Sequence, residues 1–165
     1  MGRDELPWPA KELADAMWGI DTSHRDGGRD FVQQHYEDVE KFIHQHPTTF
    51  HKAYEVLLKI PEENRLQSGF VSDLAGAMHV LCHSTMNDPQ DAERCVIFRK
   101  ALKHWSLGIR DEAQSSLSWL DDFDAIPLIQ EAAAAEQSQF ISREMSRTAI
   151  RMKKRLEKEL DEAGI

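Results

Sequence analysis

The sequence predicts an all-α protein, a compact bundle of six or seven helices that ends in a long C-terminal amphipathic helix. Apolar residues recur at intervals of three and four along nearly the whole chain, which is the period of a helix that buries one face. No stretch alternates apolar and polar residues cleanly between turn signals, as a half-buried strand would. The 165 residues, 41% of them hydrophobic, suffice for a buried core, so we expect a single helical domain over 1–165.

The chain is acidic, with 29 Asp and Glu against 20 Lys and Arg and a net charge of −9. This balance disfavours a nucleic-acid coat protein and leaves room for a local basic patch. No run approaches the roughly 20 apolar residues that span a bilayer, and the N-terminus lacks the layout of a secretory signal. Cys82 and Cys95 are too few for a disulfide framework at this size. We therefore expect a cytoplasmic protein with no membrane partner.

Turn and cap residues divide the first part of the chain into three expected helices. The first is expected over about 9–19, and the loop over 21–28 that follows it is rich in turn-forming residues. The second is expected over about 29–46. Thr48 can cap a third helix that reaches Ile60, because its side-chain oxygen can accept a hydrogen bond from an unpaired backbone amide.

The middle of the chain carries the next helices. A break is expected near Gly69, because glycine weakens a helix interior, and a better helix follows over 71–86. The next helix is expected over 89–107, ended by Gly108, and a short helix over 111–119 comes after it. The helix over 89–107 is expected to bury Val96, Ile97, Leu102 and Trp105. Acidic residues then suit the start of another helix: Asp121, Asp122 and Asp124.

The last segment, 127–163, is expected to form one long terminal helix, because it contains no internal Pro or Gly. At 1.5 Å per residue it would be roughly 55 Å long. Its apolar residues have a heptad-like spacing that predicts a packed seam: Ile141, Met145, Ala149, Met152, Leu156 and Leu160. Basic residues occupy the opposite side: Arg143, Arg147, Arg151, Lys154, Arg155 and Lys158.

These basic residues are the expected partner-binding site. The segment 143–158 has seven Lys and Arg and two Glu, and the 13 basic and 27 acidic residues elsewhere leave the remainder at −14. A cationic helix face can bind phosphates through counterion release, and arginine can hold a carboxylate or phosphate with two parallel hydrogen bonds. The alternative is a solvated face near the acidic body of the same protein or of a second copy. No aromatic residue is interleaved with these cations, which disfavours single-stranded nucleic acid as the partner.

A second pattern is a pair of histidines, His79 and His83, four residues apart on one helix face. Such a pair can supply two nitrogen ligands to zinc, with Cys82 adjacent and Cys95 on the next expected helix. No CxxC motif and no assured third ligand accompany the pair. We therefore expect no metal site and no cofactor.

A third pattern places an arginine before a histidine. Arg99 and His104 have four residues between them, and Arg29 and His35 have five. Both pairs resemble the arginine–histidine signature of the HEPN family of small helical domains, in which a dimer assembles these residues for metal-independent RNA cleavage. The resemblance implies that the histidine moves a proton while the arginine stabilises charge on the phosphate. It covers six to eight residues, and Arg99 is followed by Lys100 rather than by the polar residue common in that family. The other interpretation of His104 is a helix-end residue favourable to the helix dipole.

Signatures of nucleotide-binding loops, of serine hydrolases and of EF-hands are absent. The main hypothesis is a non-catalytic protein that binds another protein or protein complex, as a subunit, adaptor or inhibitor, through the basic side of the terminal helix. The same side could contact nucleic-acid phosphates, and the exposed seam could form a homodimer. Trp8 is a second candidate anchor. Two alternatives remain: a HEPN-like ribonuclease or its inactive relative, and an inhibitor whose acidic body mimics a nucleic acid.

Overall fold

Helices and turns make up the described part of this computed structural model, which covers residues 2–20, 28–66 and 69–165. These residues form eight α-helices and three short 3-10 helices, with no strand among them. The all-α class and the long C-terminal helix are confirmed, and the helices exceed the six or seven expected. The α-helices are α1 (Ala10–Met17), α3 (Gly28–Gln45), α4 (Phe50–Leu58), α5 (Phe70–His83), α6 (Asp88–Ala101), α7 (Leu107–Trp119), α8 (Ile126–Ala135) and α9 (Gln139–Glu162).

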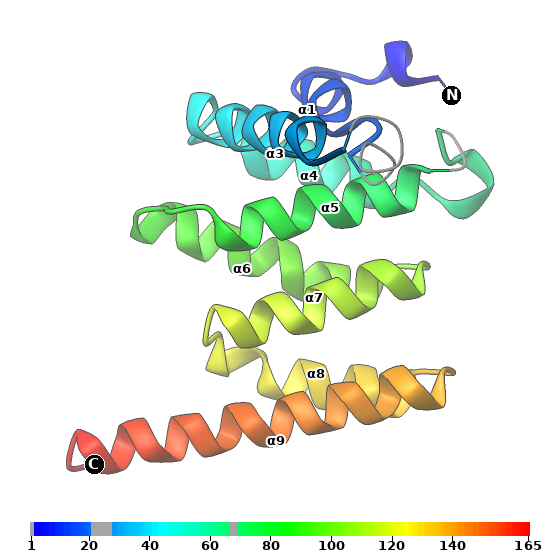
Figure 1. Cartoon of the computed structure of the whole chain (residues 1–165). Coiled ribbons are helices and arrows are strands. Elements are labelled where there is room, and N and C mark those ends of the chain that lie inside the picture. The colour runs from blue at the N-terminus through cyan, green and yellow to red at the C-terminus, as the bar shows by residue number, and fades with distance from the viewer. Residues whose placement is uncertain (1, 21–27, 67–68) are drawn as a thin grey trace.

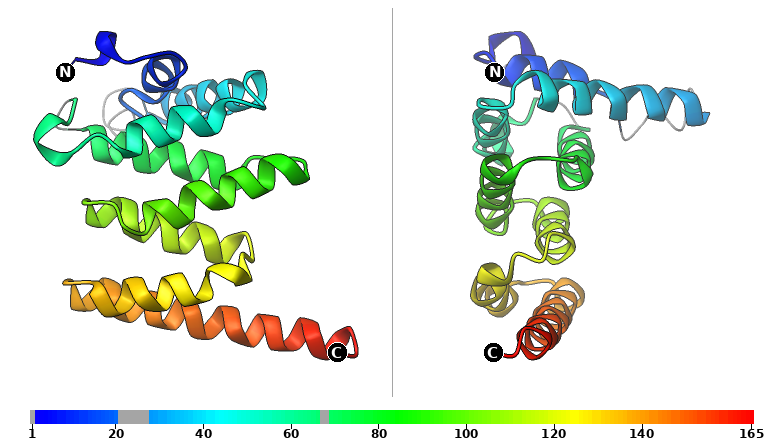
Figure 2. Two further views of the ribbon diagram at one scale, coloured as in Figure 1. Left: turned by 180° about the vertical axis from the view of Figure 1, so that it is seen from behind. Right: turned by 90° about the vertical axis from the view of Figure 1, so that its left-hand side faces the viewer.

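The helices stack in two layers (Figures 1 and 2). One layer holds α4, α6 and α8 and the other holds α5, α7 and α9, while α3 runs crosswise to them at the end of the stack near α1, as the right-hand view of Figure 2 shows. Within the layers α4 contacts α6, α5 contacts α7 and α7 contacts α9, and between the layers α6 packs on α7 and α8 on α9. Each helix therefore packs mainly on its near neighbours, as in a helical-repeat array, and α1 and α9 lie at opposite ends of the stack.

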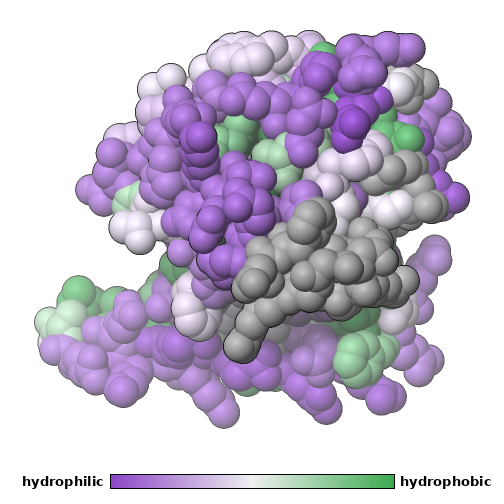
Figure 3. Space-filling model, turned by 45° about the horizontal axis from the view of Figure 1, so that its top comes forward, coloured by the Kyte–Doolittle hydropathy of each residue, from purple (hydrophilic) through white to green (hydrophobic). Residues whose placement is uncertain are grey.

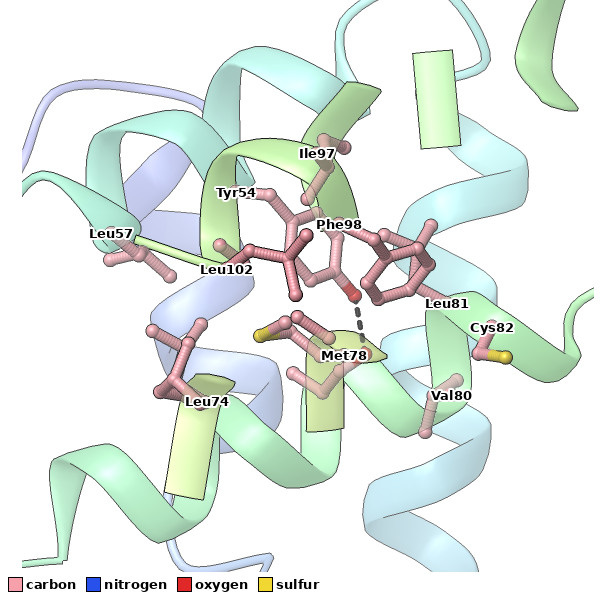
Figure 4. Close-up of a cluster of buried hydrophobic side chains, with 14 of the residues drawn as sticks. Tyr54, Leu57, Leu74, Met78, Val80, Leu81, Cys82, Ile97, Phe98 and Leu102 are labelled. Atoms are coloured by element: carbon pink, nitrogen blue, oxygen red, sulfur yellow. Dashed lines mark hydrogen bonds between the residues drawn. The ribbon is translucent and has the colours of Figure 1, made fainter. Parts of the chain in front are cut away.

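Buried apolar side chains from all eight helices form one continuous core. Figure 4 shows its central part, where Met78 and Leu81 of α5 lie near Tyr54 of α4 and Phe98 of α6. The buried Tyr54 hydroxyl donates a hydrogen bond to the carbonyl oxygen of Ala77 (2.7 Å), and burial raises the pKa of this phenol. This hydrogen bond satisfies the only polar atom that the tyrosine side chain brings into the core.

The structure corrects the prediction of one terminal helix over 127–163, because it divides this segment into α8 and α9. Just after α8, Glu136 has an extended backbone (φ −72°, ψ 127°). The Ser138 hydroxyl then caps α9 by accepting a hydrogen bond from the Ile141 amide (3.4 Å). Arg110 donates two hydrogen bonds to the Glu136 carboxylate, from Nε (2.7 Å) and from Nη2 (2.9 Å). These side chains hold a turn for which the sequence has no Pro or Gly signal.

The boundary between α6 and α7 also differs from the expectation. Gly108 does not end α6 but lies in the first turn of α7. The turn between the helices is held by side chains: His104 Nδ1 accepts from the Ser106 amide (3.0 Å), and the Trp105 indole donates to the Ile60 carbonyl (2.8 Å). Hydrogen bonds to residues outside the helix therefore stop α6 before the glycine.

Two smaller expectations are corrected. Thr49, rather than Thr48, is the N-cap residue of α4, and its side chain makes no capping hydrogen bond. Val96 is 36% exposed instead of buried, whereas Ile97 and Leu102 are buried as predicted. Both differences are local and leave the order of the helices unchanged.

α9 is the longest described helix, with 24 residues against 10 in α8, and its C-terminal half extends past the end of α8 (Figure 1). From Lys153 onward every residue is exposed except Arg155 and Leu156, which are half-buried. In Figure 3 the visible face is mostly hydrophilic, and the larger groups of hydrophobic atoms lie toward the two sides of the lower part, over the end of the stack that holds α8 and α9. No helix in the described ranges is long and apolar enough to cross a membrane.

Candidate partner-binding face on the last helix

The two sides of α9 differ in burial, as the residue spacing predicts. Four residues of the seam are buried: Ile141, Met145, Ala149 and Met152. Leu160 is 39% exposed, because α9 has by then passed the end of α8. The opposite side exposes five of the six predicted cations, which we call the basic face: Arg143, Arg147, Arg151, Lys154 and Lys158. Their role in binding stays a prediction.

The cations of the basic face differ in their partners. Arg143 and Lys154 have no ion pair within the described chain. Arg147 Nη1 lies 2.8 Å from Glu144 Oε1, and Lys158 Nζ lies 3.7 Å from the carboxylate one turn later. Both pairs lie within one helix and involve an exposed cation, and such a surface ion pair contributes about 0–1 kcal/mol. A partner's anion can therefore replace either of them readily.

Arg155, the sixth predicted cation, joins two helices instead of facing solvent. Its Nε lies 2.9 Å from Asp121 Oδ1, and its Nη2 donates to the carbonyl and hydroxyl oxygens of Ser118, both at 2.9 Å. Asp121 has a left-handed backbone (φ 51°) just after α7. Arg155 therefore connects α9 to the end of α7, and Asp121 serves this contact rather than the start of the next helix.

A hollow of about 390 Å³ opens between α7 and α9. Polar side chains of both helices line it, among them Gln114, Ser118, Thr148 and Arg151. Trp119 also lines it and is 67% exposed. Arg151 belongs to both the hollow and the basic face, so the two form one surface. The fold thus places an aromatic ring beside the cations, although none is interleaved with them in the sequence.

The two histidines considered as zinc ligands lie next to this hollow. The His79 and His83 ring centroids are 4.4 Å apart, and His83 is 4.7 Å from the Trp119 ring. His79 Nδ1 lies 3.3 Å from Glu112 Oε1, and burial, followed by the positive charges of His79 and Arg94, lowers the pKa of His83. In the part of the chain that the structure describes, no group of three or more His, Cys, Asp or Glu side chains could hold a metal ion. The histidines instead form an aromatic row with Trp119.

Both cysteines are free thiols. Burial raises the pKa of Cys82, and it raises the pKa of Cys95 to about 11. A thiol must lose its proton to act as a nucleophile, so neither side chain is activated at neutral pH.

Arg99 and His104 do not form an open catalytic pair. Arg99 donates two hydrogen bonds to the Asp122 carboxylate and lines a hollow between α6 and α8, whereas His104 lines a different one next to α4. His104 is 7% exposed, and burial together with the nearby Arg110 lowers its pKa to about 4. A histidine with this pKa is neutral near pH 7, so it is a poor acid catalyst and brings no charge to a helix dipole. This arrangement does not favour the ribonuclease alternative.

Two further candidates lie toward the other end of the stack. His35 Nδ1 is 3.2 Å from the Ala16 carbonyl oxygen, while the side chain of Arg29 lies outside the described part. Trp8 is 64% exposed next to α1, and its indole donates to Glu12 Oε2 (3.2 Å). His35 and Trp8 therefore lie outside the surface formed by the basic face and the hollow between α7 and α9.

Comparisons of the chain with known protein families, with curated proteins and with solved structures found no match. Function is therefore inferred from the residues themselves. Trp119 and Gln114, which the spacing of residues does not single out, gain a place in the candidate site only through the packing of α7 on α9.

Proposed function

We propose that this protein is a non-catalytic helical binding protein, a subunit, adaptor or inhibitor, and that its basic face docks an anionic macromolecule. The observation that carries the proposal is the position of this face at the end of the stack, where no other helix of the described chain covers it. Arg143 and Lys154 are eleven residues apart, three turns along the same side of α9, and neither has an ion pair among the described residues. Such a row of uncompensated charge attracts and orients a partner of opposite charge.

Exposed apolar side chains on the same side of α9 support a docking role. Phe140 and Ile150 are 70% and 55% exposed, and at 100° per residue both lie within about 60° of Arg143. Aromatic residues and arginine are enriched at binding interfaces and supply much of their energy. The combination is typical of an interface rather than of a purely solvated face.

The acidic remainder of the chain leaves this face largely unneutralised. Of the six predicted cations, only Arg155 pairs with an anion outside α9 among the described residues. The remainder outside 143–158 carries a charge of −14, of which Glu159, Asp161 and Glu162 lie at the C-terminal end of α9 and the rest lies on other parts of the chain. A second copy of the chain could present such an acidic surface, so a homodimer is one form of this proposal.

A cytoplasmic location is part of the proposal. The free thiols of Cys82 and Cys95 suit a reducing compartment, where disulfides are rare.

The test compares two double charge reversals that change the net charge equally. Arg143→Glu with Lys154→Glu alters two cations of the basic face that have no ion pair among the described residues. Lys41→Glu with Lys52→Glu alters exposed lysines of α3 and α4. Partners captured from a cell lysate by the full chain are eluted over a series of salt concentrations. The basic-face variant is expected to lose salt-sensitive partners at an unchanged melting temperature, while the control keeps them. Equal retention by both variants would contradict the proposal.

A further inference from the structure

Gln114 lines the hollow between α7 and α9, and its buried side-chain oxygen has no hydrogen-bond donor among the described residues. The residue is 4% exposed, and its Nε2 donates to Asp111 Oδ1 (3.0 Å) and to Ser115 Oγ (3.3 Å). Because a carboxylate accepts hydrogen bonds, the amide nitrogen must face Asp111, which fixes Oε1 as the remaining polar atom. This Oε1 is buried and has no donor among the described residues. Buried polar atoms without a partner are uncommon in native proteins. Oε1 is out of contact with solvent, so a ligand N–H group reaches it only after a neighbouring side chain moves.

Trp119 supplies an exposed aromatic surface at the same hollow. It is 67% exposed, and its contact with the His83 ring, at 4.7 Å between centroids and 58° between planes, restrains the indole. His83 in turn lies against His79, so the tryptophan ends a row of rings that crosses from α5 to α7. Nucleic-acid bases of every kind stack on such a ring, because each has a π-face.

Arg151 supplies the positive charge. It is exposed, and its Nη2 hydrogen-bonds to Thr148 Oγ1 at 3.3 Å. A guanidinium group has five N–H donors, so most of this one is available to a phosphate. The two carboxylates that line the hollow are already bound to Arg155 and Arg147. From Arg151 the exposed cations of the basic face continue along α9, with about 5.4 Å between successive turns.

We propose that the hollow between α7 and α9 binds one base of a single-stranded nucleic acid, whose phosphates follow the basic face. The base stacks on Trp119 and the adjoining phosphate binds Arg151. The N–H edge of the base donates to Gln114 Oε1 once a side-chain movement uncovers that atom. The inference rests on the proposed function, because it names the partner of the basic face. A nucleic-acid strand supplies all three groups, whereas an acidic peptide segment supplies anions without a planar N–H edge. Stacking on an exposed side chain needs an unpaired base, which favours a single strand over a duplex.

Fluorescence anisotropy of a short labelled single-stranded oligonucleotide, titrated with the full chain at low salt, tests this inference. Wild-type protein is expected to bind, and Trp119→Ala is expected to weaken binding about tenfold. Trp119→Phe should retain most of the affinity, because it keeps a stacking ring. Trp8→Ala is the matched control, since Trp8 is 64% exposed at the far end of the stack, and it should bind like wild type. Arg151→Gln should reduce the slope of log affinity against log salt by about 0.7.

Equal binding by Trp119→Ala and wild type would overturn the inference, as would a duplex or a mononucleotide that binds as tightly as the strand. Equal weakening by Trp8→Ala and Trp119→Ala would also overturn it. If wild type does not bind the strand while lysate capture still depends on Arg143 and Lys154, the inference fails and the proposed function stands. If neither the strand nor any lysate partner depends on these cations, both fail. Melting temperatures of all variants show that each result concerns binding rather than folding.

Discussion

Arg99 of α6 and Asp122 after α7 form an ion pair with two hydrogen bonds, although 23 residues separate them: Nε lies 2.7 Å from Oδ2 and Nη2 lies 2.6 Å from Oδ1. Asp122 is 9% exposed, and its hydrogen bond raises the pKa of Arg99. The pair fixes the turn that leads from α7 into α8. Arg99, the candidate catalytic residue of the sequence pattern, therefore has a structural role: it connects α6 to the turn after α7.

Arg99→Met is expected to lower the free energy of unfolding by about 2–4 kcal/mol, because it leaves the Asp122 carboxylate buried without its partner. Lys100→Met is the control. Lys100 also forms an ion pair, with Glu55 at 2.6 Å, but its side chain is 55% exposed, so the expected loss is below about 1 kcal/mol. Urea denaturation measures the free energy of unfolding of both variants. Equal losses would show that the buried ion pair stabilises the fold no more than the exposed one.

Acid is expected to destabilise the fold through His104. Its pKa in the folded protein is about 4, below the ordinary value of 6.5, so the unfolded chain binds a proton first as the pH falls. The folded state therefore loses stability between about pH 6.5 and about pH 4, and this contribution is constant above that range. His104→Gln should flatten this part of the pH profile, measured by urea denaturation. An NMR titration in which the folded ring titrates near its ordinary value would contradict the expectation.

Ser138→Ala is expected to reduce stability by about 1 kcal/mol, because it removes the hydroxyl that caps α9. Ser146→Ala makes the same chemical change at an exposed position within α9, and it should be neutral or slightly stabilising, since alanine favours a helix. Thermal denaturation compares the two. If both variants melt alike, the cap does not hold the break between α8 and α9.

Met152→Ala should cost about 2–5 kcal/mol, because the side chain is fully buried and its removal leaves a cavity. Leu160→Ala should cost less than about 1 kcal/mol, because Leu160 is 39% exposed beyond the end of α8. The sequence assigns both residues to one seam, so similar losses in urea denaturation would mean that α9 is covered along its whole length, for instance by a second copy.

Much of the helical architecture could be predicted, because its signals are local. Pro89 and Pro127 lie in the first turns of α6 and α8 as expected. The turn at Glu136 could not be predicted, because the arginine that holds it is 26 residues away and Ser138 looks like any other serine in a helical pattern. Contacts between residues far apart in the chain produce no periodic pattern in the sequence, so the sequence alone does not reveal them.

The candidate site also has a part that could be predicted from the sequence and a part that could not. The exposure of Arg143 and Lys154 follows from their spacing on a helix, which a sequence shows directly. The proximity of Trp119 to Arg151 depends on how α7 packs on α9, and the same packing removes Arg155 from the exposed set. The hypothesis that the acidic body mimics a nucleic acid stays a prediction.

The layered stack also bears on how the protein unfolds. Each helix contacts near neighbours along the chain, so most native contacts close short loops, and we expect fast folding. Such an array can open from either end without disrupting its middle. α8 and α9 form one of those ends, and a partner bound there would oppose its opening. Binding of a partner is therefore expected to slow hydrogen exchange of the α8 and α9 backbone amides, with little change at α1. Such a change would reveal binding at this end of the stack even when the partner itself is not observed.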